Sequence, residues 1–173
     1  MTKGPIRREL LTWEDVEQLM TILLDQLRQA GEYEALVMIT RGGIIPGGMI
    51  AEALDIHDVL TASVNFPHVL RDQPLAVWPT FLQFPTDSLL TDRRVLVVDD
   101  VWGSGRTSSA VHGRVVAAGG RPDLCVMHYN PYRSLFSKAE PDFYGAITDA
   151  WIIYPWEIDQ GLDRIPSRPS GAN

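Results

Sequence analysis

The chain has 173 residues with a formal net charge of −7, and 45% of its residues are hydrophobic while 21% are charged. This balance is typical of a globular protein whose length suits one domain with a sizeable core, which excludes a disordered chain. The acidic balance argues against a broad nucleic-acid surface, and no apolar run is long enough for a membrane helix.

The first predicted elements are a helix and a strand. Thr12 and Asp15 resemble a capping box, and apolar residues then recur at helical spacing until Gly31, which can end the helix. The apolar run 35–39 predicts a strand that leads into the glycine pair after Arg41. The beginning of the chain therefore has the pattern helix, strand, glycine-rich turn.

A second helix and strand follow, and then a segment without a clear pattern. Pro46 suits the first turn of a helix that reaches about Leu54, and residues 59–64 predict a strand. Residues 65–92 contain four prolines, which exclude a long helix, and several aromatic residues, which are unusual in a plain solvent loop. An excursion of this length is typical of a functional lid or of a segment with structure of its own.

The second half again alternates strands and helices. Residues 95–98 predict a buried strand, and a helix is expected from about Thr107 to Ala118. Further strands are expected over 124–129 and 151–154, while the Pro- and Ser-rich tail from residue 166 is expected to fray. This alternation predicts an α/β fold: an open, mostly parallel twisted sheet with helices on both faces.

A buried strand that runs into two acids is the most informative feature. Asp99 and Asp100 follow the apolar run, and a Gly/Ser loop then leads to a helix start near Thr107. Loop glycines let backbone N–H groups approach a phosphate, and a helix N-terminus adds partial positive charge. The carboxylates can accept hydrogen bonds from a sugar diol or hold magnesium through water. The alternative is an ordinary turn, but ionised groups at an apolar strand end are costly without partners.

This segment closely resembles the motif with which type I phosphoribosyltransferases bind phosphoribosyl pyrophosphate (PRPP). The resemblance rests on the apolar strand, the two acids and the ending Ser-Gly-x-Thr of the loop. It implies that Asp99 and Asp100 hold the ribose hydroxyls and take part in binding Mg²⁺. It also implies a loop for the ribose phosphate that consists of Gly103, Ser104, Gly105, Arg106 and Thr107.

Two further segments resemble the same family, closest to its xanthine-guanine and hypoxanthine-guanine enzymes. The run ITRGGIIPGG is similar to the pyrophosphate loop, which makes Arg41, Gly42 and Gly43 candidate pyrophosphate contacts; an ordinary strand-to-helix turn is the alternative. The run DAWIIYPWE is similar to the purine-binding hood near the C-terminus. The hood resemblance implies base contacts by Trp151 and Ile152 and a water-mediated metal contact by Glu157. For Trp151 the alternative is an ordinary core position.

Two positions depart from the pattern of the 6-oxopurine enzymes. Asn130 stands where they carry the lysine that reads the 6-oxo group, and an amide both donates and accepts, so it discriminates less strictly. Gly103 stands where they carry an aspartate thought to accept a proton from the base. These departures keep open a second hypothesis, a non-catalytic sensor of PRPP or nucleotides with the same fold, and a third, an enzyme that acts on another acceptor.

The resemblance implies a transferase of nucleotide salvage that joins a nitrogenous base, expected to be a purine, to PRPP with Mg²⁺ as cofactor and releases pyrophosphate. A domain over residues 1–165 is expected, with the hood at about 130–160 and a flexible tail at 166–173. The single cysteine and an N-terminus without an apolar core favour a cytoplasmic location. PRPP and a base are the expected partners, with no nucleic acid or membrane, and a homo-oligomer (dimer or tetramer) is expected by analogy.

Overall fold

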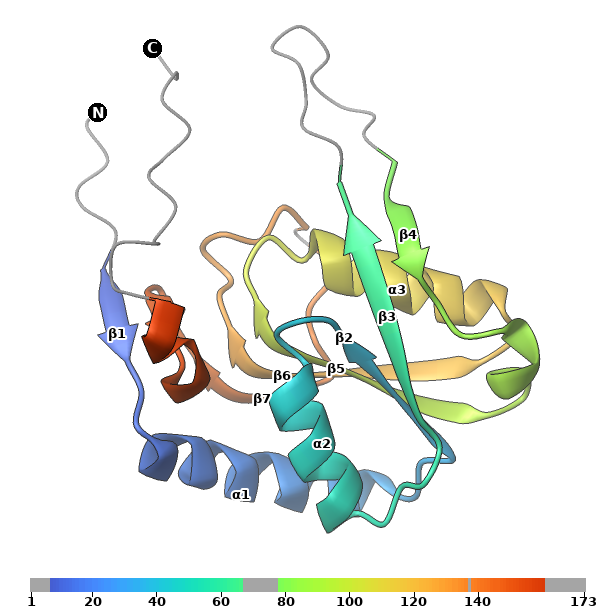
Figure 1. Ribbon diagram of the computed structural model, residues 1–173, viewed down its shortest axis with the longest axis horizontal. Coiled ribbons are helices and arrows are strands. Elements are labelled where there is room, and N and C mark those ends of the chain that lie inside the picture. The colour runs from blue at the N-terminus through green and yellow to red at the C-terminus, as the bar shows by residue number, and fades with distance from the viewer. Residues whose placement is uncertain (1–6, 67–77, 137, 161–173) are drawn as a thin grey trace, which may run out of the picture. The chain divides into compact units, whose positions relative to one another are not determined.

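The fold is described from a computed structural model (Figure 1), and the residues that the structure describes are 7–66, 78–136 and 138–160. The chain divides into two compact units, of which the larger is Leu19–Asp149 and the smaller joins Met1–Gln18 to Ala150–Asn173. The segment expected to form the hood is therefore shared between the two units. The tail at 166–173, where fraying is expected, lies outside the described residues.

The larger unit contains a six-stranded sheet with the strand order β4-β3-β2-β5-β6-β7. All neighbouring strands run parallel except β3 and β4. The strands are β2 (Ala35–Ile39), β3 (Val59–Asn65), β4 (Thr80–Gln83), β5 (Arg94–Trp102), β6 (Arg121–Tyr129) and β7 (Phe143–Ile147). The prediction of an open, mostly parallel sheet is confirmed.

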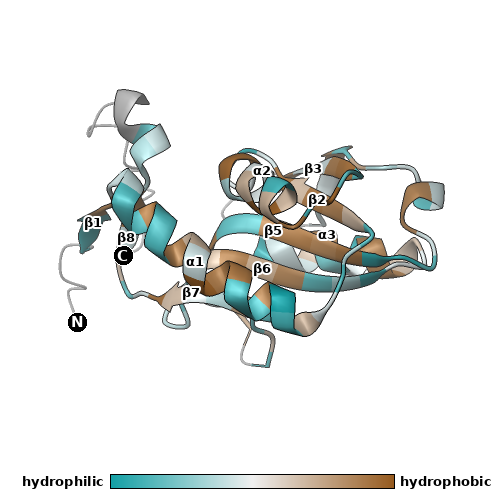
Figure 2. Cartoon of the chain, turned by 90° about the horizontal axis from the view of Figure 1, so that it is seen from below, coloured by the Kyte–Doolittle hydropathy of each residue, from teal (hydrophilic) through white to brown (hydrophobic). Residues whose placement is uncertain are grey.

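Helices lie on both faces of this sheet, as the alternating pattern predicts. The helix α2 (Ile44–Ala53) packs on the face of Leu36 and Met38, because a Cβ atom added to Gly47 would lie 2.5 Å from the Met38 side chain. The helix α3 (Arg106–Ala117) buries Val111 and Val115 in the core on the opposite face. Figure 2 shows the strands between these helices as predominantly hydrophobic, which explains why β2 and β5 form the centre of the sheet.

The strand β5 is longer than its apolar run predicts. We expect an end at Val98 from the sequence, whereas the structure continues the strand through Asp99 and Asp100 to Trp102. The neighbouring β6 explains this extension, since Trp102 still pairs with Tyr129 in the parallel register. The two acids consequently lie on the last part of a strand, which holds their backbone more rigidly than a loop would.

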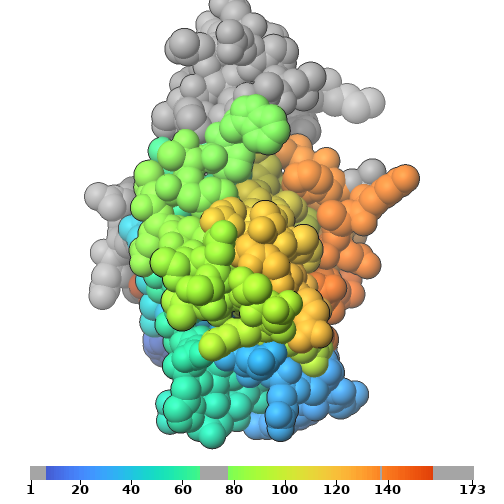
Figure 3. Space-filling view, turned by 90° about the vertical axis from the view of Figure 1, so that its right-hand side faces the viewer, coloured from blue at the N-terminus to red at the C-terminus, as the bar shows by residue number. Residues whose placement is uncertain are grey.

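The described part of the middle segment contains local structure that the sequence pattern did not assign. The strand β4 forms the antiparallel edge of the sheet, and η1 (Asp87–Leu89) is a 3₁₀ turn. The Arg114 guanidinium donates to the Asp87 carboxylate at 2.6 Å, and the Thr91 hydroxyl donates to the Ala118 carbonyl at 2.9 Å. Figure 3 shows this light green segment beside the gold end of α3. Residues 67–77, which belong to the expected lid, lie outside the described residues.

The smaller unit holds a parallel pair of short strands, β1 (Arg8–Leu10) and β8 (Trp151–Ile153), followed by the 3₁₀ helix η2 (Pro155–Gln160). The strand predicted over 151–154 is therefore present as β8, and its partner is β1 rather than a strand of the six-stranded sheet. The helix α1 (Trp13–Ala30) begins here with the predicted capping box, in which the Thr12 N–H donates to the Asp15 carboxylate at 2.7 Å. No helix in the described ranges combines the length and apolar character that a membrane span requires.

Candidate active site

The candidate site lies where the crossover helices switch from one face of the sheet to the other. From β2 the chain passes through α2 to β3, whereas from β5 it passes through α3 on the other face to β6. Open parallel sheets bind ligands at the carboxyl ends of strands beside such a switch point. The parallel register pairs Met38 with Val98, so the turn after β2 and the acids of β5 emerge at the same place.

The predicted pyrophosphate loop and the predicted ribose-binding acids are in contact. A Cβ atom added to Gly42 would lie 2.4 Å from Cγ of Asp100, and one added to Gly43 would lie 2.2 Å from the Val98 carbonyl oxygen. The loop backbone therefore lies directly against the Asp100 carboxyl group and the end of β5, which requires glycine at both positions. The Thr40–Arg41 peptide bond is cis, and the Arg41 side chain is exposed.

Asp99 is a buried acid whose ionised form is energetically unfavourable. Its side chain is 8% exposed, and its Oδ1 atom accepts a hydrogen bond from the Asp100 N–H at 3.0 Å. Burial, and then the neighbouring Asp100 charge, raise the pKa of Asp99 well above its usual range, and hydrogen bonds from the Asp100 N–H and then the Ser108 hydroxyl partly offset this. A cation, or hydroxyl donors of a ligand, would lower the cost of ionising this carboxyl group. The pair of acids therefore suits a metal ion or a ligand with hydroxyl groups.

The predicted phosphate loop leads directly into the N-terminus of α3. Gly105 is the residue before the helix and has a φ of 78°, a conformation that favours glycine. The Ser104 side chain is exposed, and its Oγ accepts a hydrogen bond from the Arg106 N–H at 3.4 Å. The first N–H groups of a helix have no partner within it, and together with the helix dipole they attract anions. This arrangement suits a phosphate group.

Two alanine substitutions in this loop should distinguish a position that requires glycine from one that tolerates a side chain. A Cβ atom at Gly105 would lie 2.4 Å from the Trp102 ring, whereas one at Gly103 would meet nothing within 4 Å. We expect Gly105→Ala to destabilise the fold by roughly 1–3 kcal/mol, because both φ and space are unfavourable. Gly103→Ala should stay within roughly 0.5 kcal/mol. Urea unfolding measures both, and equal effects would contradict the loop geometry.

The chemistry of the donor set fits magnesium. Mg²⁺ commonly binds one or two carboxylates and completes its shell with waters and substrate phosphates. Asp99 and Asp100 provide two adjacent carboxylates at the strand end. Among the residues that the structure describes, no cluster of three or more acidic, histidine or cysteine side chains forms a complete metal cage.

The remaining predicted site residues lie in different surroundings. Asn130 belongs to the larger unit and is only 1% exposed, with its N–H donating to the Trp102 carbonyl at 2.9 Å. Trp151 and Ile152 lie on β8 of the smaller unit, where the Trp151 N–H donates to the Arg7 carbonyl at 2.8 Å. Glu157 lies in the same unit, and its Oε2 accepts the Tyr154 N–H at 3.0 Å, which caps η2. The structure thus brings the phosphate and ribose candidates together within the larger unit.

One residue that the sequence pattern did not single out is Ser108. It lies on α3, is buried, and contributes its hydroxyl to Asp99. Its signal in the sequence was its place on the buried face of the helix, three residues before Val111. A serine among apolar residues on such a face needs a polar partner, and the acid at the end of the preceding strand is the partner available.

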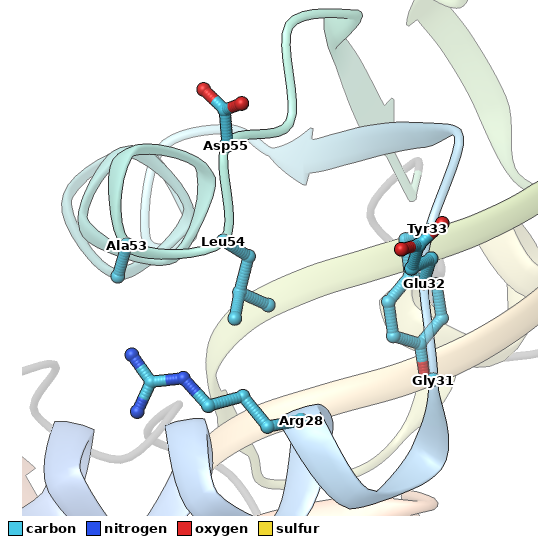
Figure 4. Close-up of a pocket in the computed structure, with 7 residues that line it drawn as sticks. All are labelled: Arg28, Gly31, Glu32, Tyr33, Ala53, Leu54 and Asp55. Carbon is cyan, nitrogen blue, oxygen red and sulfur yellow. The ribbon is translucent and has the colours of Figure 1, made fainter.

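A separate cavity of about 580 Å³ lies away from these residues. It is formed around the end of α1, the turn before β2 and the end of α2, and Figure 4 shows the Arg28 side chain extending toward the end of α2. Its lining residues are Arg28, Gly31, Glu32, Tyr33, Ala53, Leu54 and Asp55. Because the turn before β2 is at the amino end of that strand, this cavity is at the edge opposite to the candidate site.

Comparison with known proteins identifies relatives of this chain. No family model matches it. A xanthine-guanine phosphoribosyltransferase of Cereibacter sphaeroides is 31% identical over 132 residues, which cover 74% of this chain and 71% of the relative. A purine phosphoribosyltransferase structure from Pyrococcus horikoshii Ot3 has a TM-score of 0.73 and 28% identity, with coverage of 87% and 94% of the two chains.

A hypothetical protein from Neisseria gonorrhoeae, solved with bound ppGpp, shares the fold with a TM-score of 0.76, 23% identity and coverage of 91% and 95%. The match to the Cereibacter enzyme extends over more than two thirds of both chains at a level of identity that indicates common descent. The resemblance noted in the sequence is thereby confirmed: the chain belongs to the phosphoribosyltransferase family, as an enzyme related to its xanthine-guanine members.

Proposed function

We propose that this protein transfers the phosphoribosyl group of PRPP to a purine base, with Mg²⁺, and releases pyrophosphate as a step of nucleotide salvage. The observation that carries the proposal is the contact between Gly42 and Asp100, which joins the two segments expected to bind the two ends of PRPP. The names of the purine phosphoribosyltransferase relatives support a purine as the acceptor. A cytoplasmic location and a homo-oligomeric state are part of the same proposal.

The residues of the site suit the parts of PRPP in order. Asp99 and Asp100 accept hydrogen bonds from the ribose hydroxyls, and the loop from Gly103 to Thr107 binds the 5′-phosphate with backbone N–H and hydroxyl groups. Arg41 and the backbone of Gly42 and Gly43 bind the pyrophosphate. Holding both ends of the molecule fixes the anomeric carbon between them, so that the base can approach in the reactive geometry.

In the reaction, the bond from the anomeric carbon to the pyrophosphate oxygen breaks, and a bond to a nitrogen of the base forms. Positive charge develops on the ribose ring as the leaving group departs, and the carboxylates of Asp99 and Asp100 are placed to stabilise it. Magnesium held through these carboxylates and the substrate phosphates would neutralise charge on the departing pyrophosphate. Arg41 adds a permanent positive charge to the same end of the substrate.

The base side differs from the lysine-bearing enzymes that the sequence resembles. Asn130 is buried, its backbone N–H donates to the Trp102 carbonyl, and its side chain is a neutral amide rather than a cation. An amide both donates and accepts hydrogen bonds. We therefore expect weaker discrimination between 6-oxo and 6-amino purines than a lysine would provide.

Turnover tests the proposal directly. The protein is incubated with PRPP, Mg²⁺ and a panel of xanthine, guanine, hypoxanthine and adenine, and released pyrophosphate and new nucleoside monophosphate are measured. We expect stoichiometric formation of both products with at least one purine. Saturable PRPP binding without turnover across the panel would instead favour a non-catalytic sensor of PRPP or nucleotides.

The base-binding role of Trp151 has its own test. We expect Trp151→Leu to raise the KM for the purine by roughly 10-fold, because stacking of an aromatic ring on a base contributes about 1–3 kcal/mol. The KM for PRPP should change by less than about twofold, because the substitution removes a contact with the purine and none with PRPP. Initial-rate kinetics with both substrates varied measure this. Parallel increases in both KM values would indicate a structural role for the ring.

A further inference from the structure

Trp102 connects the phosphate loop to a second segment of the chain. Its side chain is 1% exposed, and the ring lies so close to Gly105 that a Cβ atom there would be 2.4 Å from ring atom Cε2. At the same edge of the ring, where a Gly105 Cβ atom would lie 2.6 Å from Nε1, the indole N–H donates to the Ser134 hydroxyl oxygen at 3.2 Å. One buried side chain therefore contacts both the loop at 103–107 and the segment at 130–136, which we call the bracing segment.

The bracing segment contacts the phosphate loop at further points. The Leu135 N–H donates to the Ser104 carbonyl at 3.0 Å, and the Phe136 ring meets the Trp102 ring edge-on at 6.4 Å between centroids. The Ser134 hydroxyl is itself fixed, because its oxygen accepts the Phe136 N–H at 3.2 Å and its hydrogen is directed to the Phe136 carbonyl at 3.1 Å. The acceptor that the indole uses is thus held in place by its own turn.

The bracing segment also begins at the candidate base-reading residue. The Asn130 N–H donates to the Trp102 carbonyl at 2.9 Å, so the backbone of Trp102 is bonded to the start of this segment while its side chain is bonded to Ser134. The pyrophosphate loop is supported differently, because Gly43 packs on the backbone of Ile39 and Val98. The two ends of the PRPP site therefore rest on different parts of β5, with the pyrophosphate loop against Val98 and Asp100 and the phosphate loop against the Trp102 ring.

We propose, on the basis of the proposed function, that Trp102 is a positioning residue for the 5′-phosphate of PRPP. Through Gly105 it fixes the backbone of the phosphate loop, and through Ser134 it ties that backbone to the bracing segment. The phosphate end of the site then depends on the Trp102–Ser134 hydrogen bond, whereas the pyrophosphate end does not. Groups that orient a binding loop in this way determine its geometry as strongly as the residues that touch the ligand.

Two small ligands measure binding at the two ends of the PRPP site separately. Ribose 5-phosphate reports on the phosphate loop, and pyrophosphate with Mg²⁺ reports on the other end. For Trp102→Phe, which keeps an aromatic ring in the core but loses the indole N–H and the ring atoms nearest to Gly105, we expect the Kd for ribose 5-phosphate to rise about 3- to 10-fold. The Kd for pyrophosphate should stay within about twofold of wild type, because the pyrophosphate loop packs on Ile39, Val98 and Asp100 rather than on the indole. Calorimetric titration of the full chain measures both.

The Ser134 variants complete the test. Ser134→Ala should weaken ribose 5-phosphate binding to a similar degree. The double variant Trp102→Phe/Ser134→Ala should bind ribose 5-phosphate about as weakly as either single variant, because all three lose the same hydrogen bond. Ser134→Thr keeps the hydroxyl and should restore wild-type binding. Tyr132→Phe is the matched control, because Tyr132 lies in the same segment but is 77% exposed, so the loss of its hydroxyl should change neither Kd.

The outcomes separate this inference from the proposed function. Wild-type protein that binds neither PRPP nor ribose 5-phosphate overturns both. Wild-type binding of ribose 5-phosphate together with unchanged affinity in Trp102→Phe and Ser134→Ala overturns only the positioning role. An equal loss of affinity for ribose 5-phosphate and pyrophosphate also overturns it, because that result indicates a general loosening of the fold.

Discussion

The variant Asp99→Asn/Asp100→Asn is expected to bind PRPP at least about 100-fold more weakly than wild type, because each carboxylate loses a charge-assisted hydrogen bond to the ribose. Asparagine preserves the shape of both side chains and leaves an oxygen at residue 99 for the Asp100 N–H, which now donates to the Asp99 carboxylate. The loss therefore reports on charge rather than on packing. Equilibrium titration with PRPP and Mg²⁺ measures it.

The same variant should be at least as stable as wild type. Burial and the Asp100 charge raise the folded-state pKa of Asp99 above its unfolded-state value. A group with a raised folded-state pKa stabilises the fold when protonated and costs stability as the pH rises and it ionises. Removing the charge at neutral pH removes this cost, so thermal unfolding should shift upward or remain unchanged. Lost binding with preserved stability is typical of residues kept for function.

Asp55→Asn provides the control. Asp55 is an exposed acid after α2, at the edge of the sheet opposite to the candidate site, and its φ of 56° is well tolerated by asparagine. PRPP affinity should be unchanged in this variant. Equal loss of affinity in both variants, or none in the Asp99→Asn/Asp100→Asn protein, would mean that these carboxylates do not hold the ribose.

Gly42→Ala is expected to reduce turnover by about 100-fold or more, because a misplacement of roughly 1 Å at a reacting centre has an effect of this size. The added Cβ atom would lie 2.4 Å from Cγ of Asp100, far inside a normal carbon–carbon contact, so either the loop or the carboxylate must move. Both ends of PRPP would then be misaligned at once. Steady-state kinetics should show a lower kcat together with a higher KM for PRPP.

Gly48→Ala is the matched control in the following helix. A Cβ atom at Gly48 meets nothing within 4 Å, and the residue is exposed in the interior of α2. Alanine should therefore stabilise the protein by about 0.5–1 kcal/mol through its higher helix propensity and leave the kinetics unchanged. Wild-type kinetics in Gly42→Ala would contradict the close contact between the pyrophosphate loop and Asp100.

Elements with a strong local pattern could be predicted from the sequence. The capping box at Thr12 and Asp15, the buried run of β5 and the glycine at residue 105 each specify local geometry through short-range interactions. The two acids and the Gly/Ser loop of 99–107 are contiguous in the sequence, so their resemblance to a known motif can be seen without the fold. For this reason the phosphate and ribose candidates could be located before any coordinates were known.

Elements defined by distant partners could not be predicted in the same way. The strand β8 pairs with β1 across most of the chain, and no local pattern encodes that choice. The edge strands β4 and β7 are short and incompletely buried, and Gly145 interrupts the apolar character of β7. The bond between Trp102 and Ser134 likewise joins residues that are 32 positions apart, so it becomes visible only in the folded chain.

The most direct test of the central claim is a crystal structure of the protein with PRPP and Mg²⁺. We predict the ribose hydroxyls at the carboxylates of Asp99 and Asp100, the 5′-phosphate at the loop that leads into α3, and the pyrophosphate beside Arg41. A structure in which PRPP binds elsewhere, or in which those carboxylates face away from the sugar, would contradict the account.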